Sequence, residues 1–407
     1  MKQQTKKKRK KWIRRRHWIV RNLAFAVLYP FIRFKYHAHI RKFKEGKERP
    51  YLVLMNHQTA YDQFFVGVSI PRSVYYVASE DLFSLGFLSK LLVWAVNPIP
   101  IKKQMTDVSA VMTCARVAKE GGTIAIAPEG NRTYAGKTGY IKPSIVGLIR
   151  FLKLPVAFFR IEGGFGAHPR WSDKIRRGRM DAGVSRVIEK DEYDKLTDDA
   201  LFALIEQELM VNEGVADAAF HSKKSAEYLE RAMYVCPECG FSTFESHKDT
   251  FRCKKCGLTA KYLPTKEIEG VGKSFPFRFL TEWYAYQEDF VNAYDAVKEK
   301  DTLLYEDEVA LFSVMLYQGK KRLKKKTALR LYGGRAEIGE GEGVLCLPFD
   351  TLEGVTVLGK NKLNIYHEGK VYQCKGDKRF CALKYVNMYH RYRNIAGGGE
   401  NGKFLGL

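Results

Sequence analysis

Short apolar runs alternate with helical patterns in the first half of the chain, and this alternation constrains the fold more than any other feature. The runs are rich in Val, Ile, Tyr and Phe, as β-strands are. We predict strands at residues 51–55, 74–78, 123–127 and 156–161. We predict helices at residues 62–69, 86–96, 106–120 and 198–210. Strands that alternate with helices indicate an α/β domain whose helices pack on the faces of a sheet.

The charge of the chain is high and unevenly spread. The 407 residues, enough for two or three domains, carry a net charge of +24. Residues 1–44 hold sixteen Lys and Arg, and the first acidic residue is Glu45. Such a field favours an anionic partner: a nucleic acid, a phospholipid surface or an acidic substrate.

Residues 17–34 follow this basic run and are mostly apolar, but they contain Arg21, Pro30 and Arg33. A spanning helix needs about twenty nearly uncharged residues, so this segment better fits a helix lying in a membrane interface. The expected apolar contacts with the membrane are Trp12, Trp18, Phe25, Leu28 and Phe31. The alternative is a helix packed on its own domain behind a basic tail.

Four of the eight cysteines form two tight pairs. Cys236 and Cys239 precede Cys253 and Cys256, with thirteen residues between the pairs. Four thiolates at this spacing predict a closed, tetrahedral structural zinc site without an open position for catalysis, and the segment resembles a zinc ribbon. The alternative is free thiols in an apolar turn. The other cysteines are scattered as in buried thiols, which indicates a reducing cytoplasm: Cys114, Cys346, Cys374 and Cys381.

The last hundred residues are rich in short strand patterns. They lie at residues 309–316, 327–331, 344–347, 354–358, 362–366 and 370–374, before a helix at 379–392. This predicts a small β-barrel or sandwich with a capping helix, loosely similar to a pleckstrin-homology or GRAM-type domain. We expect its basic segment, 319–326, to form a loop that either meets anionic lipid or is a solvated hairpin.

The expected domain organisation has five parts. They are a basic, amphipathic membrane-interface arm at 1–48, an α/β domain at 49–225, a zinc ribbon at 226–264, a helical connector at 265–300 and the β-rich domain at 301–395.

The end of the first predicted strand carries a candidate general base. His57 follows the strand and Asp62 lies five residues further on. In open α/β sheets, functional groups gather beyond the carboxyl ends of the strands. An imidazole there can take a proton from a hydroxyl, and a carboxylate on its other ring nitrogen orients it. Alone, this spacing is also compatible with capping or packing roles.

A second polar segment follows the strand at 123–127. Arg132 can grip phosphate oxygens with its planar fork, or it can pair with Glu129 in a structural turn. Upstream, Lys102 and Lys103 bring two more cations after a Pro-flanked run.

Together these segments resemble the glycerolipid acyltransferase family that includes the 1-acyl-glycerol-3-phosphate acyltransferases. Four family blocks occur in order within about residues 50–210. They are Asn56, His57 and Asp62; residues 99–103; residues 128–133; and Leu154-Pro155-Val156 leading to Glu162-Gly163. Four blocks in order are far more specific than any one of them.

The resemblance implies a role for each matching residue. His57 would be the base, Asp62 its orienting partner, and Gly130 and Arg132 the binding site for the acceptor phosphate, with Glu129 positioning the site. The sequence departs from the family pattern at three positions, with Lys103 for Arg, Asn131 for Thr and Thr133 for Ser. Lys103 should still help to hold the phosphate, although a lysine grips less specifically than an arginine.

The family implies an O-acyltransferase of phospholipid synthesis. The acyl group would come from an acyl thioester, either acyl-CoA or acyl carrier protein, and would pass to the hydroxyl of 1-acyl-glycerol-3-phosphate. We expect a peripheral or monotopic protein on the cytoplasmic face of an anionic membrane. The alternatives are another lysophospholipid or glycerol-3-phosphate as acceptor, a non-catalytic membrane scaffold, and a zinc-ribbon nucleic-acid-binding protein. Nucleic-acid binding would not require the four ordered blocks.

Overall fold

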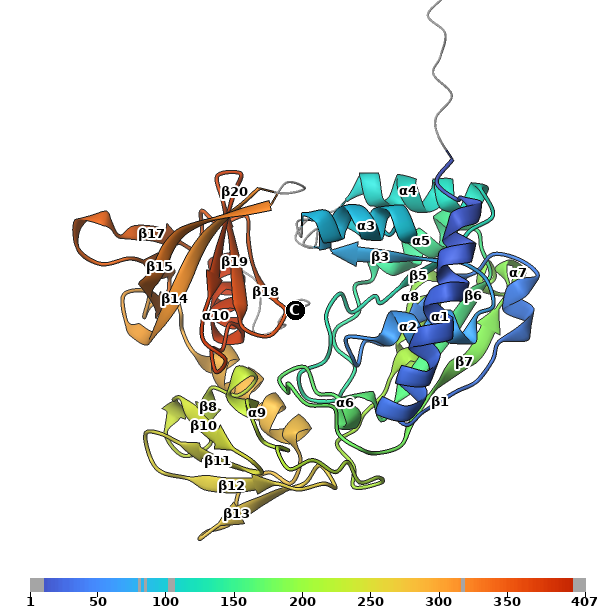
Figure 1. Ribbon diagram of the computed structural model, residues 1–407. Coiled ribbons are helices and arrows are strands. Elements are labelled where there is room, and N and C mark those ends of the chain that lie inside the picture. The colour runs from blue at the N-terminus through green and yellow to red at the C-terminus, as the bar shows by residue number, and fades with distance from the viewer. Residues whose placement is uncertain (1–10, 80–81, 84–85, 102–106, 316–318, 398–407) are drawn as a thin grey trace, which may run out of the picture.

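The computed structural model describes residues 11–79, 82–83, 86–101, 107–315 and 319–397. Figure 1 shows an α/β domain on one side and a β-rich domain on the other, with a small cysteine-containing module below the β-rich domain. The predicted site residue Lys103 lies outside the described residues.

The α/β domain is built on a seven-stranded sheet of order β1-β7-β6-β2-β5-β3-β4. Its strands are β1 (Ala38–Ile40), β2 (Leu52–Met55), β3 (Val74–Ser79), β4 (Ile99–Ile101), β5 (Thr123–Ile126), β6 (Val156–Glu162) and β7 (Met180–Ile188). The central strand β2 is parallel to both β5 and β6, and its four residues are buried. The α/β prediction is therefore confirmed, although β7 runs antiparallel to β6 and makes the sheet mixed.

Helices cover both faces of this sheet (Figure 1). They are α2 (Asp62–Ser69), α3 (Phe87–Ala95), α4 (Val108–Lys119), α5 (Ser144–Leu152), α6 (Gly164–Ala167), α7 (Lys190–Tyr193) and α8 (Asp198–Leu209). Apolar side chains of α2 pack in one buried cluster with β1, β6 and β7, whereas α4, α5 and α8 pack in a second cluster on β5 and β6. Both faces are thus buried, as the apolar strand pattern requires.

The N-terminal helix α1 (Arg15–Lys35) packs on the α/β domain along one face. Ile32 is fully buried, and Arg21 donates to the carbonyls of Gly67 at 2.7 Å and Ile70 at 2.6 Å. Phe25 and Leu28 pack against the same cluster. Two of the expected membrane contacts, Phe25 and Leu28, therefore face the protein instead, because the domain offers them an apolar surface.

Trp12 is a third expected membrane contact that the structure places against the protein, since its Nε1 donates to the carbonyl of Asn97 at 3.1 Å. Trp18 and Phe31 remain exposed. Across the described residues, no helix combines the length and apolar character needed to cross a bilayer.

The cysteine module contains a short hairpin and a four-stranded antiparallel sheet. The hairpin is β8 (Val235–Cys236) with β9 (Gly240–Phe241). The sheet contains β10 (Phe244–His247), β11 (Thr250–Cys253), β12 (Thr259–Tyr262) and β13 (Ile268–Val271). Helix α9 (Leu280–Ala293) follows, and its Trp283 donates to the carbonyl of Val235 at 2.9 Å.

The C-terminal β domain is a seven-stranded antiparallel sheet of order β17-β16-β15-β14-β20-β19-β18, packed against helix α10 (Leu383–Ala396). Its strands are β14 (Leu303–Met315), β15 (Gly319–Tyr332), β16 (Arg335–Ile338), β17 (Leu345–Pro348), β18 (Gly354–Leu358), β19 (Lys362–His367) and β20 (Lys370–Lys375). One continuous apolar core joins this domain, α9 and the cysteine module.

For the basic segment 319–326 the loop expectation is wrong, whereas the alternative of a solvated hairpin agrees with the structure. The segment forms the first half of β15, which follows β14 in the chain and pairs with it. Residues 319–324 pair with the second half of β14, and the side chains from Lys320 to Lys326 are exposed. Pairing with β14 gives the backbone N–H and C=O groups of this segment hydrogen-bond partners. The segment was not predicted as a strand because it lacks the apolar pattern on which the strand predictions rest.

Candidate active site

His57 and Asp62 form a hydrogen-bonded pair at the carboxyl end of β2. The ring Nδ1 of His57 lies 2.8 Å from Oδ2 of Asp62. Asp62 is the first residue of α2 and is fully buried, whereas the His57 side chain keeps about a quarter of its surface exposed. The carboxylate therefore holds the imidazole at Nδ1, while part of the ring remains accessible.

Asp62 is fixed by its own chain. Its carboxylate accepts hydrogen bonds from the backbone N–H of Gln58 at 2.7 Å and of Thr59 at 2.9 Å, and from the Thr59 hydroxyl at 2.6 Å. The turn between β2 and α2 thus wraps around the first carboxylate of the helix. These donors hold the carboxylate in position against the His57 ring.

Asn56 and Glu129 fix the backbone around His57. The Asn56 side chain donates to the carbonyl of Ile161 and accepts from its N–H, both at 2.8 Å. Glu129 accepts from the N–H of His57 at 2.7 Å and of Gly139 at 2.6 Å. Burial raises the pKa of Glu129 to about 8, partly offset by these two donors. Glu129 thus holds the backbone at His57 by a hydrogen bond.

Arg132 lies beside this pair with one buried guanidinium nitrogen, Nη1, that has no hydrogen-bond partner among the described residues. Burial lowers the pKa of Arg132 to about 10; the charge of Arg170 lowers it as well, while Asp62 opposes the shift. No ion pair joins Arg132 to Glu129 within the described chain, so the structural-turn alternative has no support there. A buried, unpaired cation is a site that an anion would satisfy.

Gly130 carries the chain between Glu129 and Arg132 with a φ of +69°. Side chains rarely adopt this conformation, so the turn that brings both residues towards His57 depends on glycine. No neighbouring atom lies within 4 Å of the position a Cβ would take, so the requirement is conformational and not steric.

The structure adds Arg170, which no motif indicated. It follows α6, is almost fully buried, and stacks on the Tyr134 ring at 4.2 Å from the centroid. Its Nη1 donates to the backbone carbonyl of Arg132 at 3.1 Å. Arg170 therefore adds a second cation beside Arg132. Only the fold brings the two together, since 37 residues separate them in the chain.

His57, Glu129, Gly130 and Arg170 all line one cavity of about 1100 Å³. A single ligand pocket measures roughly 300–1000 Å³, so this cavity has room for more than one small ligand. Much of its remaining lining is apolar and comes from α1, β3, α3 and α5. The apolar residues include Ala24, Phe25, Leu28, Val77, Leu92, Val96, Ile145, Leu148 and Phe151. The cavity thus combines polar groups near His57 with walls suited to hydrocarbon.

The four paired cysteines form a second site, away from His57. Their sulfur atoms all lie within 4.8 Å of one another. The Cys236–Cys256 and Cys239–Cys253 sulfurs are each 3.6 Å apart. Four thiolates bound to zinc at about 2.3 Å would be about 3.8 Å apart in a regular tetrahedron. The spacing of this cluster therefore fits one zinc ion.

The α/β domain therefore combines a histidine–carboxylate pair at a strand end, a buried cation and a largely apolar cavity. In a comparison with known proteins, residues 32–161 match the family model described as Acyltransferase. The matched range covers much of the α/β domain and holds His57, Asp62 and Arg132.

Two known proteins are similar to parts of the chain. The chain is 22% identical over 192 residues to the 1-acyl-sn-glycerol-3-phosphate acyltransferase BAT2, chloroplastic, of Brassica napus, a match covering 45% of this chain and 53% of that protein. The chain thus spans about half the length of this curated relative. A solved 1-acyl-sn-glycerophosphate (LPA) acyltransferase, PlsC from Thermotoga maritima, aligns with a TM-score of 0.38 at 18% identity, over 47% of this chain and 75% of that chain.

Proposed function

We propose that the protein transfers a fatty acyl group from an acyl thioester to the hydroxyl of 1-acyl-glycerol-3-phosphate in phospholipid synthesis. The observation that carries this proposal is the 2.8 Å pair of His57 and the fully buried Asp62 at the edge of the large, mostly apolar cavity. The resemblance of four ordered sequence blocks to the glycerolipid acyltransferases supports the choice of reaction. Acyl-CoA and acyl carrier protein are both suitable donors.

The geometry supports general-base catalysis. Asp62 holds Nδ1 of His57, so Nε2 is the atom that takes the proton of the acceptor hydroxyl. The hydroxyl oxygen then attacks the thioester carbonyl and forms a tetrahedral intermediate. When the intermediate collapses, the C–S bond breaks, the new ester forms, and the proton on His57 passes to the departing thiolate. Asp62 stabilises the imidazolium between these two steps.

Arg132 is the proposed ligand of the acceptor phosphate, supported by its buried, unpaired Nη1. We expect Arg132→Lys to raise the KM for the acceptor about tenfold or more, with a smaller effect on the donor, because lysine loses the bidentate fork. Steady-state kinetics with each substrate varied in turn measure this. Arg150→Lys is the matched control, since Arg150 pairs with Asp198 on the surface of the same domain. An unchanged acceptor KM in Arg132→Lys would assign Arg132 another role.

We also propose that the protein binds the cytoplasmic face of an anionic membrane through α1 and α3. On α1, Leu23 and Val27 are two-thirds to three-quarters exposed, and they lie one helical turn apart. The next helix, α3, exposes Phe87, Leu88, Leu91 and Trp94. Arg16 joins the two helices, donating to the carbonyl of Trp94 at 2.9 Å and lying over its ring. An apolar surface beside the basic N-terminal run fits an interfacial anchor.

A double substitution, Leu23→Glu with Val27→Glu, tests this surface without removing the core contact of Ile32. We expect binding to vesicles that contain anionic phospholipid to fall at least tenfold, because two apolar side chains, worth about 1.5–3 kcal/mol each on burial, would be replaced by charges. Vesicle co-sedimentation of the folded proteins measures this. Val271→Glu, at an exposed position in the cysteine module, is the control. Binding equal to that of the wild-type protein would exclude α1 as the anchor.

The cysteine cluster is proposed to hold one structural zinc ion, since its sulfur spacing fits a tetrahedral site. We also propose that the cysteine module is a zinc ribbon and that the C-terminal domain is of the pleckstrin-homology or GRAM type.

The remaining alternatives are another lysophospholipid or glycerol-3-phosphate as acceptor, a non-catalytic membrane scaffold, and nucleic-acid binding. A salt-sensitive gel shift without acyl transfer would favour nucleic-acid binding.

A further inference from the structure

The cavity that holds His57 has a wall from the C-terminal β domain, more than 200 residues away in the chain. Val355, Thr356 and Val357 of β18 line it, together with Val386 and His390 of α10. In Figure 1, β18 and α10 lie on the side of the C-terminal domain that faces the α/β domain. We call these five residues the C-terminal wall. The α/β domain alone would leave this side of the cavity open.

The C-terminal wall is apolar or uncharged. Val386 and His390 lie four residues apart and so share one face of α10. Burial and the charge of Lys142 lower the pKa of His390 to about 4, so its ring is neutral at physiological pH. On the α/β domain, the cavity is lined by apolar side chains of α5, including Leu148 and Phe151. A hydrocarbon chain suits such a space better than a phosphate does.

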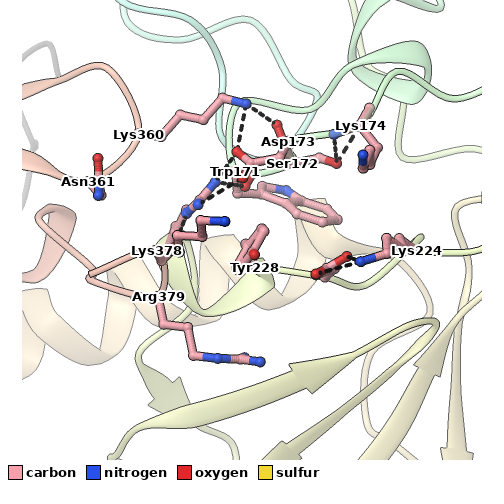
Figure 2. Close-up of polar contacts among 12 residues, drawn as sticks. Trp171, Ser172, Asp173, Lys174, Lys224, Tyr228, Lys360, Asn361, Lys378 and Arg379 are labelled. Atoms are coloured by element: carbon pink, nitrogen blue, oxygen red, sulfur yellow. Dashed lines mark hydrogen bonds and ion pairs between the residues drawn. The ribbon is translucent and has the colours of Figure 1, made fainter. Parts of the chain in front are cut away.

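A polar contact between the domains holds the C-terminal wall in place (Figure 2). Asp173, in the loop after α6, accepts from Nη1 of Arg231 at 2.7 Å and from Nζ of Lys360 at 2.9 Å. Lys360 comes from the turn between β18 and β19, and its Nζ also donates to the carbonyl of Ser172 at 2.6 Å. Nε of Arg231 donates to the carbonyl of Lys378 at 2.6 Å. We call the trio of Asp173, Arg231 and Lys360 the Asp173 clamp.

The Asp173 clamp joins three parts of the molecule and is electrostatically strong. Arg231, from the cysteine module, is only 3% exposed and would be left as a buried charge without Asp173. Although burial opposes the shift, hydrogen bonds from Arg231 and Lys360 lower the pKa of Asp173 to about 2. Asp173 is therefore ionised throughout the physiological range. Because Lys360 lies in the turn directly after β18, the clamp fixes the position of the C-terminal wall.

The clamp also lies close to the proposed phosphate site. Burial lowers the pKa of Lys360, and the charges of Arg231 and Arg132 lower it further, against the effect of Asp173. Lys360 and Arg132 therefore repel each other electrostatically across the domain boundary. A shift of the C-terminal domain would change the cavity wall and the surroundings of Arg132 together.

We propose that the C-terminal β domain completes the substrate cavity and limits the length of the acyl chain that the enzyme accepts, with the Asp173 clamp holding that limit in place. This inference rests on the proposed acyl transfer. The chain in contact with the wall belongs either to the donor or to the acceptor, since both carry the same hydrocarbon chemistry.

His390→Trp tests the wall, because it adds bulk at a half-buried position without replacing a core residue. One series varies the acyl length of the thioester at fixed acceptor, and a second varies the acyl length of the acceptor at fixed donor. We expect kcat/KM for the longest chains to fall about tenfold or more in one series, with the shortest chains unaffected. His367→Trp, a half-buried histidine of β19 outside the cavity, is the matched control and should keep the wild-type profile.

Two results would overturn the inference in distinguishable ways. Suppose that the wild-type protein transfers acyl groups and the His390→Trp variant has the wild-type chain-length profile in both series. The C-terminal wall then does not limit chain length, while the proposed function stands. If wild-type protein transfers no acyl group to any acceptor, the proposed function fails and the wall fails with it.

Lys360→Met tests the clamp, because methionine retains much of the apolar stem and removes the charge. We expect a shift in chain-length preference and a higher KM for the affected substrate, with kcat largely kept, and we expect Lys360→Arg to restore the wild-type profile. Lys326→Met is the control, since Lys326 pairs with Glu308 at an exposed position on the same domain. An unchanged profile, or an equal loss of kcat for every chain length, would contradict a positioning role for Lys360.

Discussion

Replacing His57 with alanine is expected to lower turnover roughly a hundred- to ten-thousand-fold, which is the usual contribution of a general base to the rate. The reason is geometric: Asp62 holds Nδ1 of the ring at 2.8 Å, and His57 lines the cavity. Alanine leaves the backbone N–H that Glu129 binds, so the surrounding turn should persist. Rates of thiol release with acceptor present, together with circular dichroism and the melting temperature, measure both effects.

The α/β domain offers a matched control for this variant. His39 also lies beside an aspartate, with Nδ1 at 3.2 Å from Oδ1 of Asp181, but the His39 side chain is 62% exposed. His39→Ala should therefore keep wild-type turnover. Near-normal turnover in a folded His57→Ala protein would contradict general-base catalysis by this residue.

Replacing Cys253 with serine is expected to destabilise the cysteine module severely. Zinc binding contributes about 10–16 kcal/mol to the folding of small zinc modules, and a fourth thiolate is essential to a closed site. Cys236 and Cys253 are fully buried in the core that also contains α9 and the C-terminal sheet, so the loss should spread to that sheet. Elemental analysis should find about one zinc per wild-type chain and much less in the variant, with a lower melting temperature.

The control for the metal site is Cys346→Ser, because Cys346 is an exposed thiol of β17. This variant should keep its zinc and its melting temperature. Freshly purified, reduced wild-type protein without zinc would rule out the metal site. A Cys253→Ser protein as stable as the wild type would show that the cluster does not support the fold.

The parts of the fold that could be predicted are those in which local pattern and packing agree. The apolar runs of β2, β5 and β6 are buried on both sheet faces and were located within one residue. Strand β7 was not predicted, because Ser185 and Arg186 interrupt its apolar pattern. Its place at the side of β6 is decided by pairing between distant segments, which a local pattern does not contain.

The candidate site also contains some contacts that the sequence predicts and others that only the fold produces. The pairing of His57 with Asp62 is local, because a five-residue turn brings the first carboxylate of α2 back to the ring. The approach of Arg132 follows from β5 lying next to β2 in the sheet. Arg170 and His390 reach the cavity, and Lys360 reaches Asp173, only through tertiary packing and the junction between domains. No spacing in the sequence indicates these contacts.

The central claim is acyl transfer to a glycerolipid phosphate, and release of free thiol from a long-chain acyl thioester tests it most directly. Purified full-length protein would be assayed with 1-acyl-glycerol-3-phosphate, other lysophospholipids and glycerol-3-phosphate, with the lipid products identified. We predict thiol release that depends on an acceptor, is fastest with 1-acyl-glycerol-3-phosphate, and matches the diacyl product formed. Folded protein that releases no thiol with any of these acceptors, or releases it equally without one, would contradict the proposal.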